Sequence, residues 1–135
     1  PVESSSVPAA TIEFAGTKVR FGLVHPFSPR PSNQGLWNRS LDSLAQLQHY
    51  DSLYVLMGDF NSTWDHASLR YLLGGRFLDS GEQAGEGLHM TYPAMLPVSE
   101  IDHIVHDKSV VVGDLETRCI PGSDHRALLA TLEVS

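Results

Sequence analysis

Residues 53–61 read LYVLMGDFN and join a continuous apolar run, Leu53–Met57, to a polar turn. A run without polar alternation is typical of a strand buried on both faces, as in sheets that helices cover. Gly58 permits a sharp turn after this run, so that Asp59 and Asn61 can face one pocket. Gly, Asp and Asn are also common turn formers, so this turn alone indicates no chemistry. Its place at a strand end is nevertheless where open α/β sheets bind ligands.

The segments around this central strand predict a layered α/β sandwich. The expected elements, in chain order, are strands at 11–15 and 18–24, an amphipathic helix at 36–50, the strand at 53–57, a short helix capped by Asp65 and ended by Gly74-Gly75, a mobile surface loop at 79–88, and strands at 99–106, 109–117 and 127–134. A hairpin strand, a helix and a doubly buried strand in that order favour the α/β class. Residues 1–10 are small, polar and proline-bearing, which predicts a linker or disordered tail, and residues 11–135 form one domain-sized portion.

Composition restricts the function more than the fold. The 135 residues hold 9 Lys and Arg against 16 Asp and Glu, for a net charge of -7. Phosphate-backbone binding draws on Lys and Arg, so long duplex DNA is a poor candidate substrate. Cys119 is alone, so no internal disulfide forms, and we expect a small core or loop residue there.

No apolar run approaches the roughly 20 residues that span a bilayer. The chain begins with Pro1 rather than Met, and we interpret it as a processed or cloned piece of a longer protein. An upstream membrane anchor stays open, and so does the compartment.

Two further segments place ionisable groups in or beside apolar strands. Asp102 lies within the apolar run of residues 101–105, where a buried carboxylate needs a partner. That partner is either backbone amides or an imidazole that Asp102 orients. His103 and His106 face opposite sides of a strand, which argues against a zinc site.

The other segment is the turn Gly122-Ser123-Asp124-His125, just before the last strand. Adjacent Asp and His side chains on such a turn can reach one small volume. A carboxylate suits a hard divalent cation, and an imidazole exchanges protons near neutral pH. A solvated loop is an equally simple interpretation of this turn alone.

Taken together and in this order, GDFN (58–61), IDHI (101–104) and GSDH (122–125) resemble the endonuclease/exonuclease/phosphatase superfamily. His25-Pro26 at the end of the strand at 18–24 resembles the family's histidine at that point. The resemblance covers nearly everything from residue 11 to 135. It implies the deoxyribonuclease-I-like four-layer αββα sandwich. The run HPFSPRP (25–31), Arg39 and Thr91-Tyr92-Pro93 look most like uncharacterised bacterial members, some of them membrane-anchored.

The resemblance also implies a role for each motif residue. These roles are His125 as general base or phosphate-stabilising imidazole, Asp102 as its orienting carboxylate, Asp59 positioning the attacking water, Asn61 and His25 binding non-bridging phosphate oxygens, and Asp124 ligating Mg²⁺ or Mn²⁺. The metal and these donors would offset charge that develops on the phosphate during in-line displacement.

The chain departs from the family in its N-terminal half. That half normally provides an Asn and a metal-binding Glu, and neither has a counterpart here. We therefore expect the C-terminal portion of the sandwich, inactive by itself, from a metal-dependent phosphodiesterase or nuclease. Small phosphoesters, lipid head groups and single-stranded nucleic acid are the open substrate classes, and a phosphomonoesterase acting on a lipid or inositol head group is the second enzyme reading.

The alternative is a non-catalytic binding or assembly module that keeps the fold. Either way, the surface that the missing half would cover is expected to bind that half, or another copy of the chain.

Overall fold

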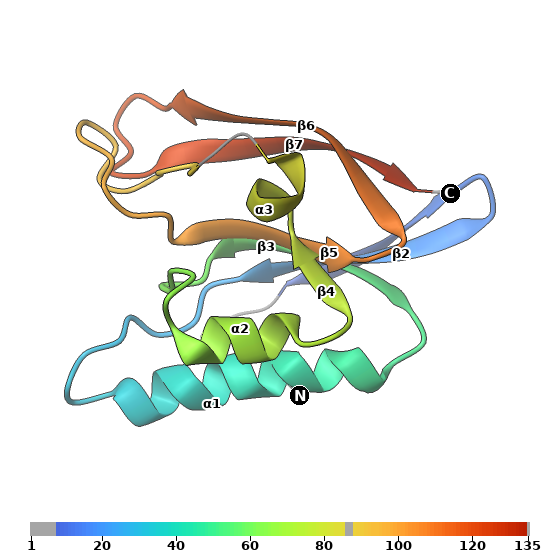
Figure 1. Ribbon diagram of the computed structural model, residues 1–135, viewed down its shortest axis with the longest axis horizontal. Coiled ribbons are helices and arrows are strands. Elements are labelled where there is room, and N and C mark those ends of the chain that lie inside the picture. Colours follow the sequence, from blue (N-terminus) through green and yellow to red (C-terminus); the bar gives the residue numbers. More distant parts are fainter. Residues whose placement is uncertain (1–7, 86–87, 135) are drawn as a thin grey trace.

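The computed structural model describes residues 8–85 and 88–134 (Figure 1). In chain order the elements are β1 (Ala9–Phe14), β2 (Thr17–Val24), α1 (Gln34–Ala45), the 3-10 helix η1 (Gln46–His49), β3 (Leu53–Asp59), α2 (Ala67–Leu73), β4 (Phe77–Asp79), α3 (Ser80–Ala84), β5 (Asp102–Asp107), β6 (Val110–Cys119) and β7 (Arg126–Val134). This mixture of helices and strands confirms the α/β class. Within the described ranges, none of the helices has both the length and the apolarity to cross a bilayer.

The larger sheet has five strands in the order β1-β2-β3-β5-β4, with β3 at its centre. β3 pairs in parallel with β2 and antiparallel with β5. Val55 and Leu56 are both buried although neighbours on a strand face opposite sides, so both faces of β3 are covered. The pairing sets Gly58 beside Val24 and Asp59 beside Asp102. The ends of three strands therefore meet at one edge of the sheet.

Helices α1 and α2 cover one face of this sheet (Figure 1). Leu41 and Leu44 of α1 pack with Leu69 of α2 in one core cluster, because their spacing puts them on the buried side of each helix. The α-helix ends at Ala45 and tightens into η1 instead of continuing to Tyr50 as predicted.

The β6–β7 hairpin lies across the opposite face of the sheet, so the chain forms a helical layer, a sheet and a hairpin (Figure 1). Leu115 of β6 packs against Val19 and Val55 in a second core cluster. The rest of this interface is open. An apolar groove of about 480 Å³ runs between the layers, lined by side chains that include Phe14 of β1 and Leu128 of β7.

Residues 79–84 differ from the mobile loop predicted for 79–88, of which residues 86–87 lie outside the described residues. Asp79 ends β4, and its Oδ1 accepts the Gly81 N–H at 2.7 Å, which caps the short helix α3. Asp79 and Ser80 are buried. The prediction failed because this carboxylate has a buried partner, His103, at 2.6 Å and does not need solvent.

Smaller differences concern the ends of elements. β1 begins at Ala9, inside the predicted tail, whose residues 1–7 lie outside the described residues. His66 rather than Asp65 precedes α2, and the Asp65 carboxylate accepts the Thr63 hydroxyl instead of capping the helix. Cys119 is exposed at the end of β6.

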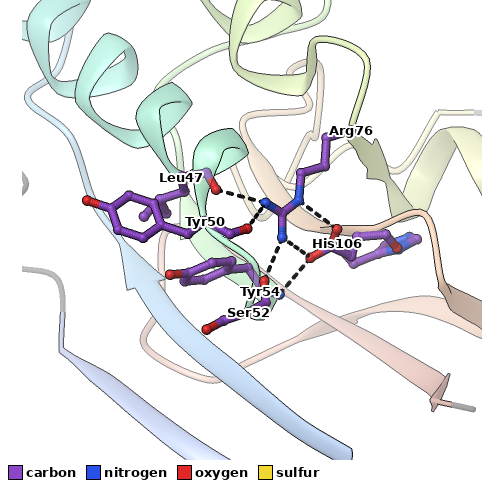
Figure 2. Close-up of polar contacts among 7 residues, drawn as sticks. Leu47, Tyr50, Ser52, Tyr54, Arg76 and His106 are labelled. Carbon is purple, nitrogen blue, oxygen red and sulfur yellow. Dashed lines mark hydrogen bonds and ion pairs between the residues drawn. The ribbon is translucent and has the colours of Figure 1, made fainter.

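Arg76 ties the helical layer to the sheet (Figure 2). Its Nε and Nη2 donate to the Asp107 carboxylate of β5 at 2.8 and 3.0 Å. Asp107 also accepts the Tyr54 N–H at 2.8 Å. The guanidinium donates further to three backbone carbonyls, that of Leu47 in η1 and those of Tyr50 and Ser52 in the η1–β3 connection.

Candidate active site

The predicted site residues lie at the sheet edge where β2 and β3 end and β5 begins. Gly58 allows these strands to meet, because a Cβ on it would lie 2.2 Å from the Val24 carbonyl oxygen. Its φ of +141° is also one that side chains rarely adopt. Asn61 itself has a φ of +48°, so the turn after Asp59 is a left-handed one. The glycine of the GDFN motif is thus required by backbone geometry.

Asp59 lies at the centre of this edge. Its Oδ1 accepts the backbone N–H of Asn61 at 2.7 Å. Burial raises the pKa of the Asp59 carboxyl; the Asn61 N–H lowers it in part, and the nearby Asp102 carboxylate raises it further. Two carboxylates side by side on β3 and β5 favour a bound cation or proton in their vicinity.

Asp102 and His125 form the hydrogen-bonded pair that the resemblance implies. His125 Nδ1 lies 2.8 Å from Asp102 Oδ2. Burial lowers the pKa of His125, but the hydrogen bond and charge of Asp102, followed by the charges of Asp59 and Asp124, outweigh it and leave the pKa raised. The imidazolium form is therefore favoured.

Thr91 is a member of this site to which the sequence had assigned no role. Its side chain is fully buried, and its hydroxyl donates to Asp102 Oδ2 at 2.6 Å, the same oxygen that faces His125. Its carbonyl accepts the Arg126 N–H at 2.8 Å, next to His125. The only sequence signal was its place in the Thr91-Tyr92-Pro93 run ahead of IDHI.

His25 and Asn61 lie at the rim. His25 Nε2 is 3.8 Å from Asp59 Oδ2, and its side chain is largely exposed. The Asn61 side-chain amide donates to the Pro26 carbonyl at 3.0 Å, which leaves one of its two N–H groups for other partners. The structure thus brings His25, Asp59, Asn61, Asp102 and His125 together, while the phosphate contacts assigned to His25 and Asn61 stay predictions.

The metal that the family resemblance implies needs oxygen ligands. Asp124 is exposed on the turn before β7, and it joins no cluster of three candidate ligands among the described residues. Such a cluster is formed by Asp59, Asp102 and His125, whose ligand atoms lie within 4.8 Å of one another. Because Asp102 Oδ2 already accepts two hydrogen bonds, Asp59 is the better oxygen donor within this cluster, and the ligand role assigned to Asp124 stays a prediction. Asp59 fits part of a Mg²⁺ site, which usually combines one or two carboxylates with substrate phosphate oxygens.

A second cluster of candidate ligands, Asp79, Glu100 and His103, is fully buried. His103 Nδ1 lies 2.6 Å from the Asp79 carboxylate and its Nε2 lies 2.7 Å from the Ser62 carbonyl. Both ring nitrogens face acceptors, so both carry protons and neither is a ligand. Burial lowers the pKa of His103, but Asp79 outweighs it and the pKa is raised. This cluster is an internal ion pair, and His106 is not part of it, as the sequence predicts.

Several solved structures are similar to the chain. They include an endonuclease/exonuclease/phosphatase family protein from Leptotrichia buccalis, with 18% identity and a TM-score of 0.72 over 94% of the chain and 52% of that protein. A humanized TDP2 of D. rerio has 18% identity and a TM-score of 0.75 over 93% of the chain and 59% of that protein. A mannosyl-6-phosphatase of Bacteroides thetaiotaomicron has 21% identity and a TM-score of 0.66 over 88% of the chain and 52% of that protein. At these identities the likeness shows the fold alone.

The chain spans little more than half of the length of these structures. No curated protein matches it in sequence. The sequence pattern of the Endonuclease/Exonuclease/phosphatase family, however, matches residues 3–125, which is most of the chain. The chain therefore belongs to the endonuclease/exonuclease/phosphatase family and forms part of its deoxyribonuclease-I-like α/β fold.

Proposed function

We propose that the chain carries the phosphate-binding and proton-handling part of a metal-dependent phosphoester hydrolase of the phosphodiesterase or nuclease type. The observation that supports this best is the His125–Asp102 pair, held at 2.8 Å and directed at the Asp59 carboxylate. Family membership and the fold of the similar structures agree with it.

The spacing around Asp59 suits a small oxygen ligand. His25 Nε2 and His125 Nε2 each lie 3.8 Å from Asp59 Oδ2. This distance is too long for a direct hydrogen bond. A water seated there can donate to the Asp59 carboxylate, and a phosphate oxygen can accept from the two imidazoles. Asp59 would orient the attacking water, and the two imidazoles would donate to non-bridging phosphate oxygens.

The protonation state of His125 bears on its role. A raised pKa favours the imidazolium, which donates a hydrogen bond and adds positive charge where the phosphate gains negative charge. Of the two roles that the family resemblance leaves open, the pKa direction supports the phosphate-stabilising one. Asp102, itself held by Thr91, would keep the Nε2 of His125 directed at the substrate.

A bound Mg²⁺ or Mn²⁺ would supply further charge stabilisation and polarise the phosphate. Asp59 and Asp124 are the residues of this chain that would hold it. We infer that the working enzyme is longer than this chain, since the chain spans about half of the structures it matches. Upstream residues would complete the ligand set and cover the apolar groove, and the chain by itself would be inactive.

Hydrolysis of bis(4-nitrophenyl) phosphate with Mn²⁺ or Mg²⁺ tests the proposal. The longer protein should be active, EDTA should abolish the activity, and His125→Ala should lower the rate at least about a hundredfold. His49→Ala is the matched control, because this exposed histidine ends η1 outside the site cluster.

Two results would contradict the proposal. Metal-dependent activity that survives His125→Ala would place the chemistry elsewhere. A longer protein that binds metal but hydrolyses no phosphomonoester or phosphodiester would favour the alternative, a binding or assembly module that keeps the fold.

A further inference from the structure

The loop Tyr92–Val98, named the rim loop below, presents apolar side chains to solvent beside the candidate active site. Met95 is 93% exposed, Leu96 is 73% exposed and Val98 is 64% exposed. Single exposed apolar residues are ordinary, but three within four positions form a continuous uncovered tip. The rim loop also contains no charged residue.

The rim loop is held firmly at its base. The Tyr92 carbonyl accepts the N–H groups of Val98 and Ser99, and the Ser99 carbonyl accepts those of Thr91 and Tyr92. These bonds close the loop as a narrow hairpin-like turn. Its apolar tip therefore projects from an ordered base and does not belong to a freely moving segment.

Further bonds tie the rim loop to the active-site turn. The buried Ala94 donates its N–H to the Asp124 carbonyl at 2.7 Å, and its own carbonyl accepts Arg126 Nε at 2.9 Å. The Tyr92 ring lies 4.7 Å from the imidazole of His125, measured between ring centroids. Met95 follows Ala94 directly, about 3.8 Å further along the backbone. The apolar tip thus adjoins the groups that would bind phosphate.

The chemistry of the tip discriminates among classes of partner. Single-stranded nucleic acid is bound by basic grooves and stacking aromatics, whereas Met95, Leu96 and Val98 are aliphatic and the chain carries a net charge of -7. Energetic centres of protein interfaces are enriched in Trp, Tyr and Arg. The rim loop itself carries no charged side chain, and the Arg126 guanidinium contacts its base at Ala94 rather than its tip. Aliphatic side chains suit the acyl region of a bilayer, where binding grows with buried apolar area.

We propose that the rim loop inserts Met95, Leu96 and Val98 into the surface of a lipid bilayer and so presents lipid phosphoesters to the site. The assignment of lipid phosphoesters as the substrate class rests on the function proposed above. Because it is driven by apolar burial, binding should be greatest on uncharged or zwitterionic lipid and little affected by salt. Anionic lipid should weaken it, since the chain is acidic.

Co-sedimentation of the chain with phosphatidylcholine vesicles tests the insertion without any use of hydrolysis. Met95→Ser combined with Leu96→Ser should weaken binding at least about tenfold, since two aliphatic side chains lose their burial in lipid. Leu36→Ser combined with Val111→Ser is the control, because both side chains are exposed outside the rim loop. The control should bind as the original chain does, and circular dichroism should show that both variants fold.

A second measurement locates the inserted residue. In separate variants, Met95→Trp should give a blue-shifted emission on adding phosphatidylcholine vesicles, and Val111→Trp should not. Equal binding by the rim-loop and control variants would overturn the proposal, as would loop-dependent binding to single-stranded DNA with none to vesicles. Failure of the hydrolysis assay alone would leave the vesicle result standing, so the two proposals fail separately.

Discussion

At the scale of single residues, burial lowers the pKa of His125, and the Asp102 carboxylate is the main group that raises it. Replacing Asp102 with Asn removes the negative charge that raises the pKa of His125. Burial still lowers this pKa, so the pKa of His125 should fall. NMR titration of the His125 imidazole measures this directly. Asp124→Asn is the control and should lower the pKa less, because Asp124 is the smallest of the named contributions.

The fall in the pKa of His125 should also change how the activity of the longer protein depends on pH. If the imidazolium binds phosphate, the rate falls as pH rises through the pKa of His125. Asp102→Asn should then move this falling limb to lower pH. An unchanged His125 pKa in the Asp102 variant would show that the hydrogen bond does not set the charge of the imidazole.

Gly58 is a position of the site where the backbone accommodates no side chain. Gly58→Ala forces a Cβ against the Val24 carbonyl and a side chain into positive φ, so we expect a loss of roughly 3 kcal/mol in the free energy of unfolding. Urea denaturation measures it. Gly35→Ala is the matched control, since it lies in α1 with open space around its Cβ and should gain about 0.5 to 1 kcal/mol. Similar stability of both variants would refute this account of Gly58.

At the scale of elements, Arg76 holds the η1–β3 connection against β5 (Figure 2). Arg76→Met leaves the largely buried Asp107 carboxylate without its cation, so the free energy of unfolding should fall by about 3 kcal/mol. Arg118→Met is the control: its ion pair with Glu116 is exposed, and the change should stay within about 0.5 kcal/mol.

A double-mutant cycle separates the ion pair from the carbonyl contacts. Asp107→Asn combined with Arg76→Met should cost less than the sum of the two single variants, because each single variant strands the partner's charge. Additive losses would mean that the backbone carbonyls, and not Asp107, account for the effect of Arg76.

Local sequence patterns predicted most of these elements. The apolar run of Leu53–Met57 and the spacing of Leu41 and Leu44 mark structure that depends on burial of a strand or a helix face. The failure at residues 79–84 has a specific cause. Asp79 and His103 are 24 positions apart, and only their contact allows acidic, glycine-rich sequence to be buried.

At the scale of the whole molecule, the apolar groove beside β7 leaves the two layers incompletely closed against each other. Since Phe14 is exposed beside the groove and the inner face of β7 is only half-buried, we expect the chain to associate with itself as its concentration rises. Sedimentation velocity over a concentration series measures this. Phe14→Lys should reduce association, while Phe27→Lys, outside the groove, should not. A strictly monomeric chain at high concentration would show that the groove needs no cover.

The sequence by itself determined the fold class, the family and the residues of the His125–Asp102–Asp59 group, because these depend on short-range patterns and three compact motifs. Only the tertiary structure decided what surrounds them. The Thr91 bond to Asp102 forms across the base of the rim loop, and the placing of this loop beside His125 joins segments that are distant along the chain. Such contacts arise from strand register and packing. The local sequence around a hydroxyl or an aliphatic side chain does not predict which residue it will contact.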